Sequence, residues 1–246
     1  MVKLVGILNV TPDSFTDGGN FFDPAAALAQ AKKLFTDGAA MVDVGAESTR
    51  PHAVALTPDE EWLRLEPVLR ELLVLYSGKI SVDTYHPETV HRALSLGPVI
   101  INDVTGMNNP GMVEAVSELK PTVIISHLPG ADIQAAHASD PVSTVEQVKR
   151  DLLAKAELLM SKGLSREQII LDPGVGFGKT MALNEKLLKF AEEVPEYKVM
   201  IGYSRKRFLG EKRLDNEVNL AAGRIAKEHG AAYIRVHDVA GHASLL

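Results

Sequence analysis

Eight short apolar runs, separated by stretches with helical spacing, constrain the fold more than any other feature of this sequence. The runs occupy residues 3–8, 39–44, 79–83, 98–101, 121–126, 168–172, 198–201 and 231–236. Most are continuous rather than alternating, which is typical of strands buried on both faces of a parallel sheet. Because eight such runs alternate with helical patterns in 246 residues, we expect a (β/α)8 barrel rather than an open doubly wound sheet, with residues 1–246 forming one domain.

The segments between the runs carry helix-start signals. Asp23 and Pro24 supply an N-cap and a proline in the first helical position. Thr57 and Glu60 have the spacing of a capping box. Seven helices are expected in all, and the others cover residues 87–96, 112–119, 143–162, 182–193 and 217–229.

The eighth run is followed only by residues 238–246, which are too few for a full closing helix. We therefore expect a barrel with a short or missing last helix. A partner chain or a swapped segment is one way to cover the surface that such a helix would bury.

Composition excludes several classes of protein. A net charge of −6 gives no basic surface for nucleic acid, and no apolar run approaches the ~20 residues that a membrane helix needs. The chain has no cysteine, which excludes disulfides and thiolate metal sites. No signal peptide is visible at the N-terminus. The sequence therefore predicts a cytoplasmic protein that binds neither nucleic acid nor membranes.

Polar residues follow the apolar runs at the strand ends where barrels of this kind build their active sites. They are Asn9, Asp43, Asp83, Asn102, His127, Asp172, Ser204, Lys206 and His237. A buried carboxylate such as Asp83 or Asp172 can meet two N–H donors of a flat polar heterocycle, and Asn102 can both donate and accept. The alternative for each aspartate is a cap at the end of its strand.

Arg235 and His237 alternate along the last run, so their side chains point to the same face. A guanidinium can stack on a heterocycle and bind a diphosphate. The alternative is an inward-facing arginine paired with an acid. His237, Asp238 and His242 do not have the spacing of a zinc site.

The segment 174–180 superficially resembles a phosphate-binding loop. A Walker A motif needs a glycine five residues before its Gly-Lys pair, and Pro173 stands there. An ATPase is therefore not predicted. The glycines of this segment more plausibly let the backbone approach a ligand and project Phe177.

The segment 6–19 resembles the N-terminal signature of dihydropteroate synthases, which join a dihydropterin to p-aminobenzoate in folate synthesis. Six further motifs resemble this family in the family's order. They are residues 43–51, 81–85, 101–104, 126–127, 172–179 with 204–206, and 235–238.

The resemblance implies a role for each matching residue. It assigns Asp83, Asn102, Asp172, Lys206 and Arg235 to the pterin, and Asn9, Arg235 and His237 to the diphosphate, with Asn9 also a ligand of Mg²⁺. It assigns Phe15, Thr49, Pro51, Phe177 and Lys206 to p-aminobenzoate, and makes Asp17, Lys206, Arg235 and His237 the catalytic residues. It also implies a homodimer formed through the last helices.

The chain departs from the family pattern at two positions besides its end. Ala46 stands where the family often has glycine, and Arg207 where it often has a pocket serine. Ser204 has no evident base beside it in the sequence, which argues against a nucleophilic serine. Three rival interpretations stay open: a pterin-dependent methyltransferase, a non-catalytic pterin-binding subunit, and a barrel enzyme with an unrelated substrate.

Overall fold

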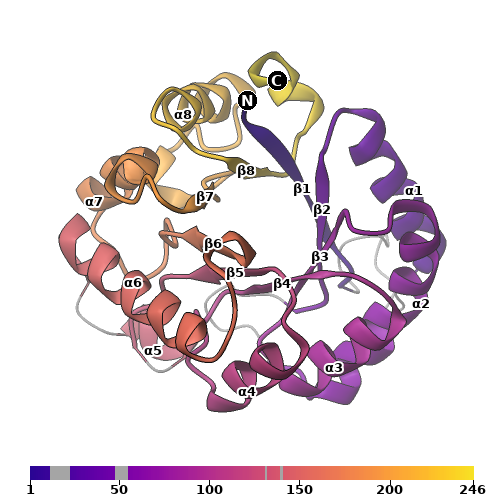
Figure 1. The fold of residues 1–246 in the computed structure, drawn as a ribbon. Helices are drawn as coiled ribbons and strands as arrows, with labels where there is room; N and C mark the ends of the chain where they lie inside the picture. Colours follow the sequence, from indigo (N-terminus) through magenta and orange to yellow (C-terminus); the bar gives the residue numbers. More distant parts are fainter. Residues whose placement is uncertain (12–22, 48–54, 131, 139–140) are drawn as a thin grey trace.

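Eight parallel strands close into a barrel in chain order, from β1 next to β2 round to β8 next to β1. The computed structural model describes residues 1–11, 23–47, 55–130, 132–138 and 141–246. Helices ring the barrel, with each strand followed by helical structure on the outside (Figure 1). The predicted (β/α)8 barrel is therefore confirmed.

Every predicted apolar run overlaps a strand. The strands are β1 (Lys3–Asn9), β2 (Met41–Gly45), β3 (Ile80–Asp83), β4 (Ile100–Asp103), β5 (Val123–Ser126), β6 (Ile169–Asp172), β7 (Lys198–Ile201) and β8 (Tyr233–Val236). The observed strands start up to two residues later than the runs, because apolar residues also line the turns that enter them. The strand register pairs Asn9 with Gly45, Gly45 with Asp83, and Asp83 with Asn102, which brings these residues to one rim.

The helices follow the predicted order. They are α1 (Pro24–Thr36), α2 (Pro58–Tyr76), α3 (Pro87–Leu96), α4 (Pro110–Leu119), α5 (Ile133–Ala138), α6 (Val145–Ser161), α7 (Met181–Lys186) and α8 (Asn216–Glu228). Short 3-10 segments are η2 (Arg166–Gln168), η3 (Leu187–Glu193), η4 (Arg207–Leu209) and η5 (Ala240–Leu245). Asp23 caps α1 by accepting from Ala25 N, and the capping box of Thr57 and Glu60 opens α2. The sequence did not predict α5, and the single helix expected over 182–193 is α7 continued as η3.

The barrel interior is apolar in the middle of the strands and polar at their carboxyl ends, which form the rim. Val5, Met41, Ile124, Ile170 and Met200 form a buried cluster inside the strands, separate from the larger core between strands and helices. Because side chains alternate along a strand, residues two positions past this cluster also point inward. The polar side chains of the rim therefore lie directly above this buried apolar cluster, which forms the floor of the site.

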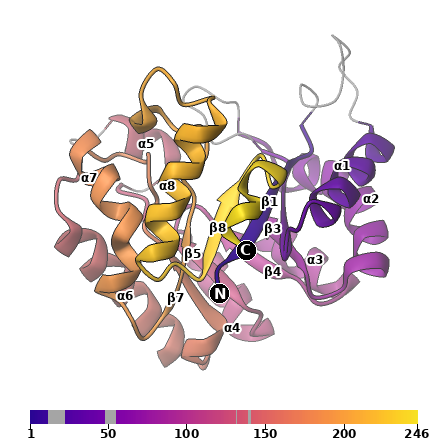
Figure 2. The same ribbon diagram turned by 90° about the horizontal axis from the view of Figure 1, so that it is seen from above.

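The segment after β8 packs against the chain's own helices. In η5, His242 is 1% and Leu245 2% exposed, and Lys227 of α8 donates to the Leu245 carbonyl. This segment lies between α8 and α1 (Figures 1 and 2), and a Cβ built at Gly38 would lie 2.9 Å from Leu246 Cδ1. The residues after β8 thus form the 3-10 segment η5, which covers part of the surface for which a partner was considered.

Candidate active site

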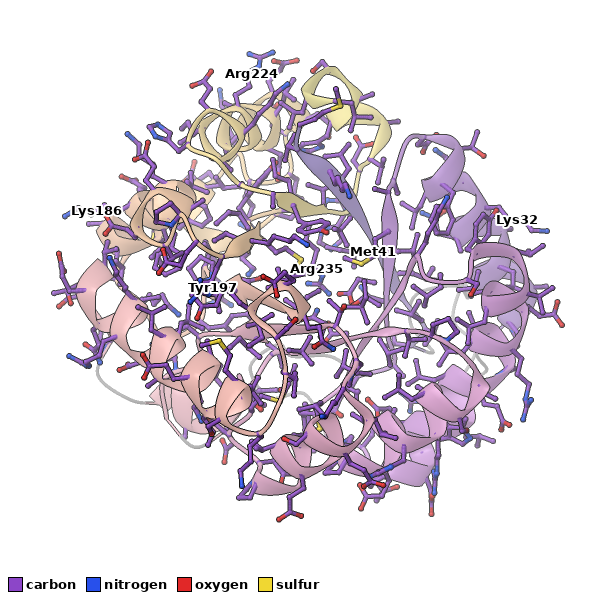
Figure 3. The ribbon with its side chains drawn as sticks, viewed as in Figure 1. Lys32, Met41, Lys186, Tyr197, Arg224 and Arg235 are labelled. Carbon is purple, nitrogen blue, oxygen red and sulfur yellow. The ribbon has the colours of Figure 1, made fainter. Side chains whose placement is uncertain are left out.

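Arg235 is the centre of the polar rim. Its Nε donates to Asp43 Oδ2 at 2.6 Å, and its NH2 donates to Asp83 Oδ2 at 2.8 Å. Asn102 Nδ2 donates to the same Asp43 oxygen at 3.0 Å. Arg235 pairs in register with Val5 and points into the barrel, where Figure 3 places it near Met41. Of the alternatives that the sequence left open for Arg235, the pairing of an inward-facing arginine with acids is present in this structure.

Asp43 is a site residue to which the sequence analysis gave no role. Its side chain is almost fully buried, at 1% exposed, and it orients both Arg235 and Asn102. The alternation of side chains along a strand could have revealed it. Asp43 lies two positions after the inward-facing Met41 on the same strand, so it also points inward.

Two buried acceptors at this rim have no hydrogen-bond partner in the described part of the chain. They are Asp43 Oδ1 and Asn102 Oδ1. A buried acceptor left without a donor costs about 1–3 kcal/mol, so it is seldom retained unless water or a ligand meets it. The rim is therefore suited to a ligand rich in N–H donors.

Asp172 and Lys206 extend the rim on the other side of Arg235. A Cβ built at Gly202 would lie 3.5 Å from Asp172 Oδ2, 3.9 Å from Arg235 Cβ and 4.0 Å from Lys206 Nζ. Asp172 Oδ1 accepts from Gly174 N at 2.7 Å, which leaves its second oxygen facing Gly202. The absence of a side chain at Gly202 keeps the approach to these groups open.

Phe177 lies beside Lys206, as the predicted second pocket requires. Lys206 Nζ is 4.7 Å from the centroid of the Phe177 ring and donates to the Val175 carbonyl. The apolar ring and the ammonium group are thus presented together at the end of β6.

Lys179 holds the loop that carries Phe177, a role the sequence did not reveal. Its ammonium donates to the carbonyls of His127, Gly174 and Phe177 at 3.0, 2.8 and 2.9 Å. A Cβ at Gly174 would lie 2.1 Å from the His127 carbonyl oxygen, so only glycine fits there. Gly174 therefore lets this segment approach the neighbouring loop closely, whereas the predicted approach to a ligand stays a prediction.

Burial moves four charged groups of the site towards neutrality. Burial and repulsion from Asp43 raise the pKa of Asp83 to about 7, although Arg235 opposes the shift. Burial raises the pKa of Asp172 despite the nearby Lys206. Burial lowers the pKa of Lys206 to about 8, and burial with repulsion from Lys206 lowers that of Lys179 to about 7. The charge of the rim therefore changes between about pH 7 and pH 8.

Ser204 has a histidine beside it, so the expectation that no base lies near it was wrong. His237 Nδ1 is 3.0 Å from Ser204 Oγ, and His237 N donates to the same oxygen at 3.3 Å. The two residues are 33 positions apart and meet only because β7 and β8 are neighbours. This contact fixes the imidazole ring at the rim.

The remaining predicted residues divide into three groups. Asn9 is exposed at the end of β1, where a ligand can reach it. His127 turns away from the rim, with Nε2 3.3 Å from Asp151 of α6. Phe15, Asp17, Thr49 and Pro51 lie outside the described residues. The two departures from the family pattern differ in exposure, since Ala46 is buried and Arg207 is exposed in η4.

The amide oxygen of Asn9 is of the ligand type that Mg²⁺ accepts. Mg²⁺ favours oxygen ligands, keeps several waters and leans on substrate phosphates, so a single exposed amide oxygen is an adequate protein ligand. A zinc site at 237–242 does not fit, because His242 is buried and its Nδ1 lies 2.6 Å from the Asp238 carbonyl. Among the described residues, metal-ligand spacing occurs instead at Glu47, Glu61 and His86.

Comparisons with known proteins agree with this geometry. The pterin-binding enzyme family matches residues 5–237. Dihydropteroate synthase of Neisseria meningitidis serogroup C is 38% identical over 99% of this chain and 90% of its own length. The Escherichia coli K12 dihydropteroate synthase is 36% identical over 96% of this chain and 86% of its own length.

The chain belongs to the dihydropteroate synthase family. Its fold agrees as well. The dihydropteroate synthase of Xanthomonas albilineans with 4-aminobenzoic acid superposes with a TM-score of 0.88, at 37% identity over 99% of this chain and 90% of that one. The Yersinia pestis dihydropteroate synthase with a sulfonamide drug gives 0.90, at 32% identity over 99% and 91%.

The chain is thus a transferase of folate biosynthesis, and the family resemblance found in its sequence is confirmed. Neither a pterin-dependent methyltransferase nor a barrel enzyme with an unrelated substrate agrees with these relatives. Among the described residues, no helix is both long and apolar enough to cross a membrane.

Proposed function

We propose that the chain condenses 6-hydroxymethyl-7,8-dihydropterin diphosphate with p-aminobenzoate, giving 7,8-dihydropteroate and diphosphate. The observation that carries this proposal is the gathering of Asp83, Asn102, Asp172, Lys206 and Arg235 on one rim. A structure of the Xanthomonas albilineans relative contains 7,8-dihydropteroate, which supports the same product for this chain.

The pterin is proposed to lie over the apolar floor of the barrel. Its guanidine-like edge carries several N–H donors, and the carboxylates of Asp83 and Asp172 are suited to accept them. Asn102 Oδ1, which has no partner in the described residues, accepts another. Lys206 donates to the pterin carbonyl oxygen. Arg235 stacks on the ring, held in place by its Nε bond to Asp43.

The diphosphate is proposed to bind above the pterin. Asn9, Arg235 and His237 supply donors at the ends of β1 and β8. Mg²⁺ bound with Asn9 would neutralise charge on the leaving group. Ser204 keeps the His237 ring oriented for this contact. Such preorganised charges favour the leaving group as negative charge develops on it.

The reaction substitutes one bond for another at the pterin's exocyclic methylene. The C–O bond to diphosphate breaks, the arylamine nitrogen forms the new C–N bond, and that nitrogen releases one proton. If the C–O bond breaks first, the cation left on the pterin is stabilised by the acidic rim and, in the prediction from sequence, by Asp17. Ser204 needs no covalent role in this scheme.

p-Aminobenzoate is proposed to lie against Phe177 and Lys206, which sit side by side, with Phe15, Thr49 and Pro51 completing its pocket as the sequence predicts. The 4.7 Å contact between the Lys206 ammonium and the Phe177 ring supports this position. Arg207 is exposed, so it replaces the usual serine without entering the rim.

The decisive experiment measures diphosphate release from the pterin substrate with Mg²⁺, with and without p-aminobenzoate. Release that requires p-aminobenzoate and yields dihydropteroate supports the proposed reaction. Release without p-aminobenzoate would mean that the second pocket is impaired. Pterin binding with no release would instead favour the non-catalytic pterin-binding subunit.

Three further proposals come from the sequence. Residues 1–246 act as one pterin-binding barrel domain, two copies form a homodimer, and the enzyme works in the cytoplasm. The family pairs through its last helices. The exposed apolar side chains on α2 are elsewhere, and they are Leu63 and Val74, which are 77% and 82% exposed. Sedimentation of the purified chain tests the homodimer directly.

A further inference from the structure

Two glutamates and a histidine face one another on the outer side of the barrel, away from Arg235. Glu47 follows β2, Glu61 lies in the first turn of α2, and His86 precedes α3. One side-chain ligand atom from each residue lies within 4.8 Å of the other two. Asp83 points inward to Arg235, whereas the next residue, Thr84, bonds Glu61 of α2. The cluster is therefore separate from the pterin rim.

Each residue of this cluster has one buried side-chain atom without a hydrogen-bond partner in the described part of the chain. Glu61 is only 1% exposed, and its Oε1 has no hydrogen-bond partner in the described part of the chain. Glu47 Oε2 and His86 Nε2 are also buried without a partner there. The Nε2 and Oε2 atoms are 3.5 Å apart, which in this orientation makes no hydrogen bond. Each residue of the cluster thus has a buried polar atom that makes no hydrogen bond to the described residues, and a bound cation would satisfy such atoms.

The other oxygen of each carboxylate is firmly held. Glu61 Oε2 accepts from Thr84 Oγ1 at 2.8 Å and from Thr89 Oγ1 at 2.5 Å. Glu47 Oε1 accepts from the Tyr85 hydroxyl. Protein metal sites use this arrangement, in which outer hydrogen bonds orient each carboxylate so that its second oxygen meets the ion.

The cluster also lacks a fixed positive charge. No lysine or arginine of the described segments lies within 4.0 Å of either carboxylate, and His86 is the only basic ion-pair partner there. Burial raises the pKa of Glu61, and the two carboxylates outweigh burial to raise the pKa of His86. Two neighbouring carboxylates in a buried place repel each other unless a cation neutralises them.

The dimensions suit direct coordination. The centre of a triangle with sides of at most 4.8 Å lies within about 2.8 Å of each corner, and bonds from zinc to nitrogen and carboxylate oxygen are about 2.0–2.2 Å. Small side-chain rotations therefore bring all three atoms into coordination range. One imidazole nitrogen with two carboxylates favours a transition ion over magnesium or calcium.

We propose that Glu47, Glu61 and His86 bind one divalent transition-metal ion of the zinc type, with water as its remaining ligand. The ion would tie the β2–α2 connection, the first turn of α2 and the start of α3 together. It is a structural site, distinct from the magnesium proposed at Asn9. This inference does not depend on the proposed reaction.

The test uses the full chain, stripped with a chelator and dialysed, with no substrate present. Zn²⁺ is titrated by calorimetry, and Co²⁺ is added as a spectroscopic probe whose visible absorption reports tetrahedral coordination. We expect one strongly bound ion per chain and tetrahedral Co²⁺ bands. Zn²⁺ at 100 times its dissociation constant should raise the melting temperature by roughly 5–10 °C.

Two variants and one control assign the binding to this cluster. His86→Ala and Glu61→Gln should each weaken the ion by at least about 100-fold, since outer-shell changes alone weaken such sites by roughly 10–100-fold. Glutamine at 61 keeps the shape of the side chain and still accepts from the two threonines, so this variant should fold. His91→Ala removes an exposed histidine of the same α3 and should bind the ion normally. An unmodified chain that binds no Zn²⁺, or binding that survives both variants, would overturn the proposal.

Discussion

Asp43→Asn is the most informative perturbation of the proposed pterin site, because Asp43 acts on the ligand only through its neighbours. Repulsion from its charge is the second cause, after burial, that raises the pKa of Asp83 to about 7. A like charge at close range shifts a pKa by roughly one to three units. We therefore expect Asp83 in the variant to titrate about one to two pH units lower than in the unmodified chain.

This shift predicts a measurable change in pterin affinity. Only the ionised Asp83 accepts the pterin's N–H groups, so affinity in the unmodified chain should fall about tenfold between pH 8 and pH 6. In Asp43→Asn the fall should be less than about threefold over the same range. The assay is calorimetric titration with 6-hydroxymethyl-7,8-dihydropterin, whose lack of diphosphate removes phosphate ionisation from the profile.

Stability should change with pH in the opposite direction, falling as pH rises where pterin affinity rises. The unfolded pKa of Asp83 is 3.8 and the folded value is about 7. Between these values the folded chain holds a proton that the unfolded chain has lost, so the free energy of unfolding falls as pH rises through this window. For each pH unit by which Asp43→Asn lowers the folded pKa of Asp83, the loss of unfolding free energy across this window becomes smaller by about 1.4 kcal/mol.

Asp59→Asn is the matched control, since it removes an exposed aspartate that pairs with Arg92 on the surface. Its pterin profile should match that of the unmodified chain. Asp83→Asn should abolish the fall in pterin affinity between pH 8 and pH 6. Any fall that remains would be caused by protonation of Asp172. If pterin affinity of Asp43→Asn still fell about tenfold around pH 7, the proposed repulsion between Asp43 and Asp83 would be refuted.

Three other variants test the supports of the site. Lys179→Met should lower the free energy of unfolding by about 2–4 kcal/mol in urea denaturation and weaken p-aminobenzoate binding, because three carbonyls lose their buried donor. Tyr203→Phe should raise it by up to about 1 kcal/mol, because the Tyr203 hydroxyl is buried without a partner in the described residues. Ser204→Ala should retain turnover within about tenfold while raising the KM for the pterin diphosphate, since loss of a hydrogen bond costs about 1 kcal/mol; a complete loss of turnover would restore a nucleophilic serine.

Local sequence patterns predicted the barrel well. Continuous apolar runs need burial on both faces, and the Asp23-Pro24 pair and the capping box of Thr57 and Glu60 each begin a helix. These signals extend over a few residues, so they survive without knowledge of the fold. The segment that forms α5 is only six residues long, and the sequence analysis missed it although Asp132 accepts from Ala135 N at its start.

Contacts between distant strands could not be predicted in this way. The bond from Arg235 to Asp43 joins residues 192 positions apart, and it exists because closure of the barrel places β8 beside β1. The Ser204–His237 contact and the Lys179–His127 bond arise in turn because β7 lies beside β8 and β5 beside β6. The sequence identified the polar residues of the rim, but their pairing depends on strand register.

The outer ion site and the pterin rim should be linked through charge. Repulsion from Glu61 is among the smaller causes that raise the pKa of Asp83, after burial and Asp43. A cation bound to Glu61 offsets that repulsion, so saturating Zn²⁺ should lower the pH at which pterin affinity falls, by less than Asp43→Asn does. The pH at which pterin affinity falls should therefore be highest for the stripped chain, lower for the Zn²⁺-bound chain and lowest for Asp43→Asn. Glu61→Gln should imitate the ion without binding it, and a Zn²⁺ shift that persists in this variant would contradict the link.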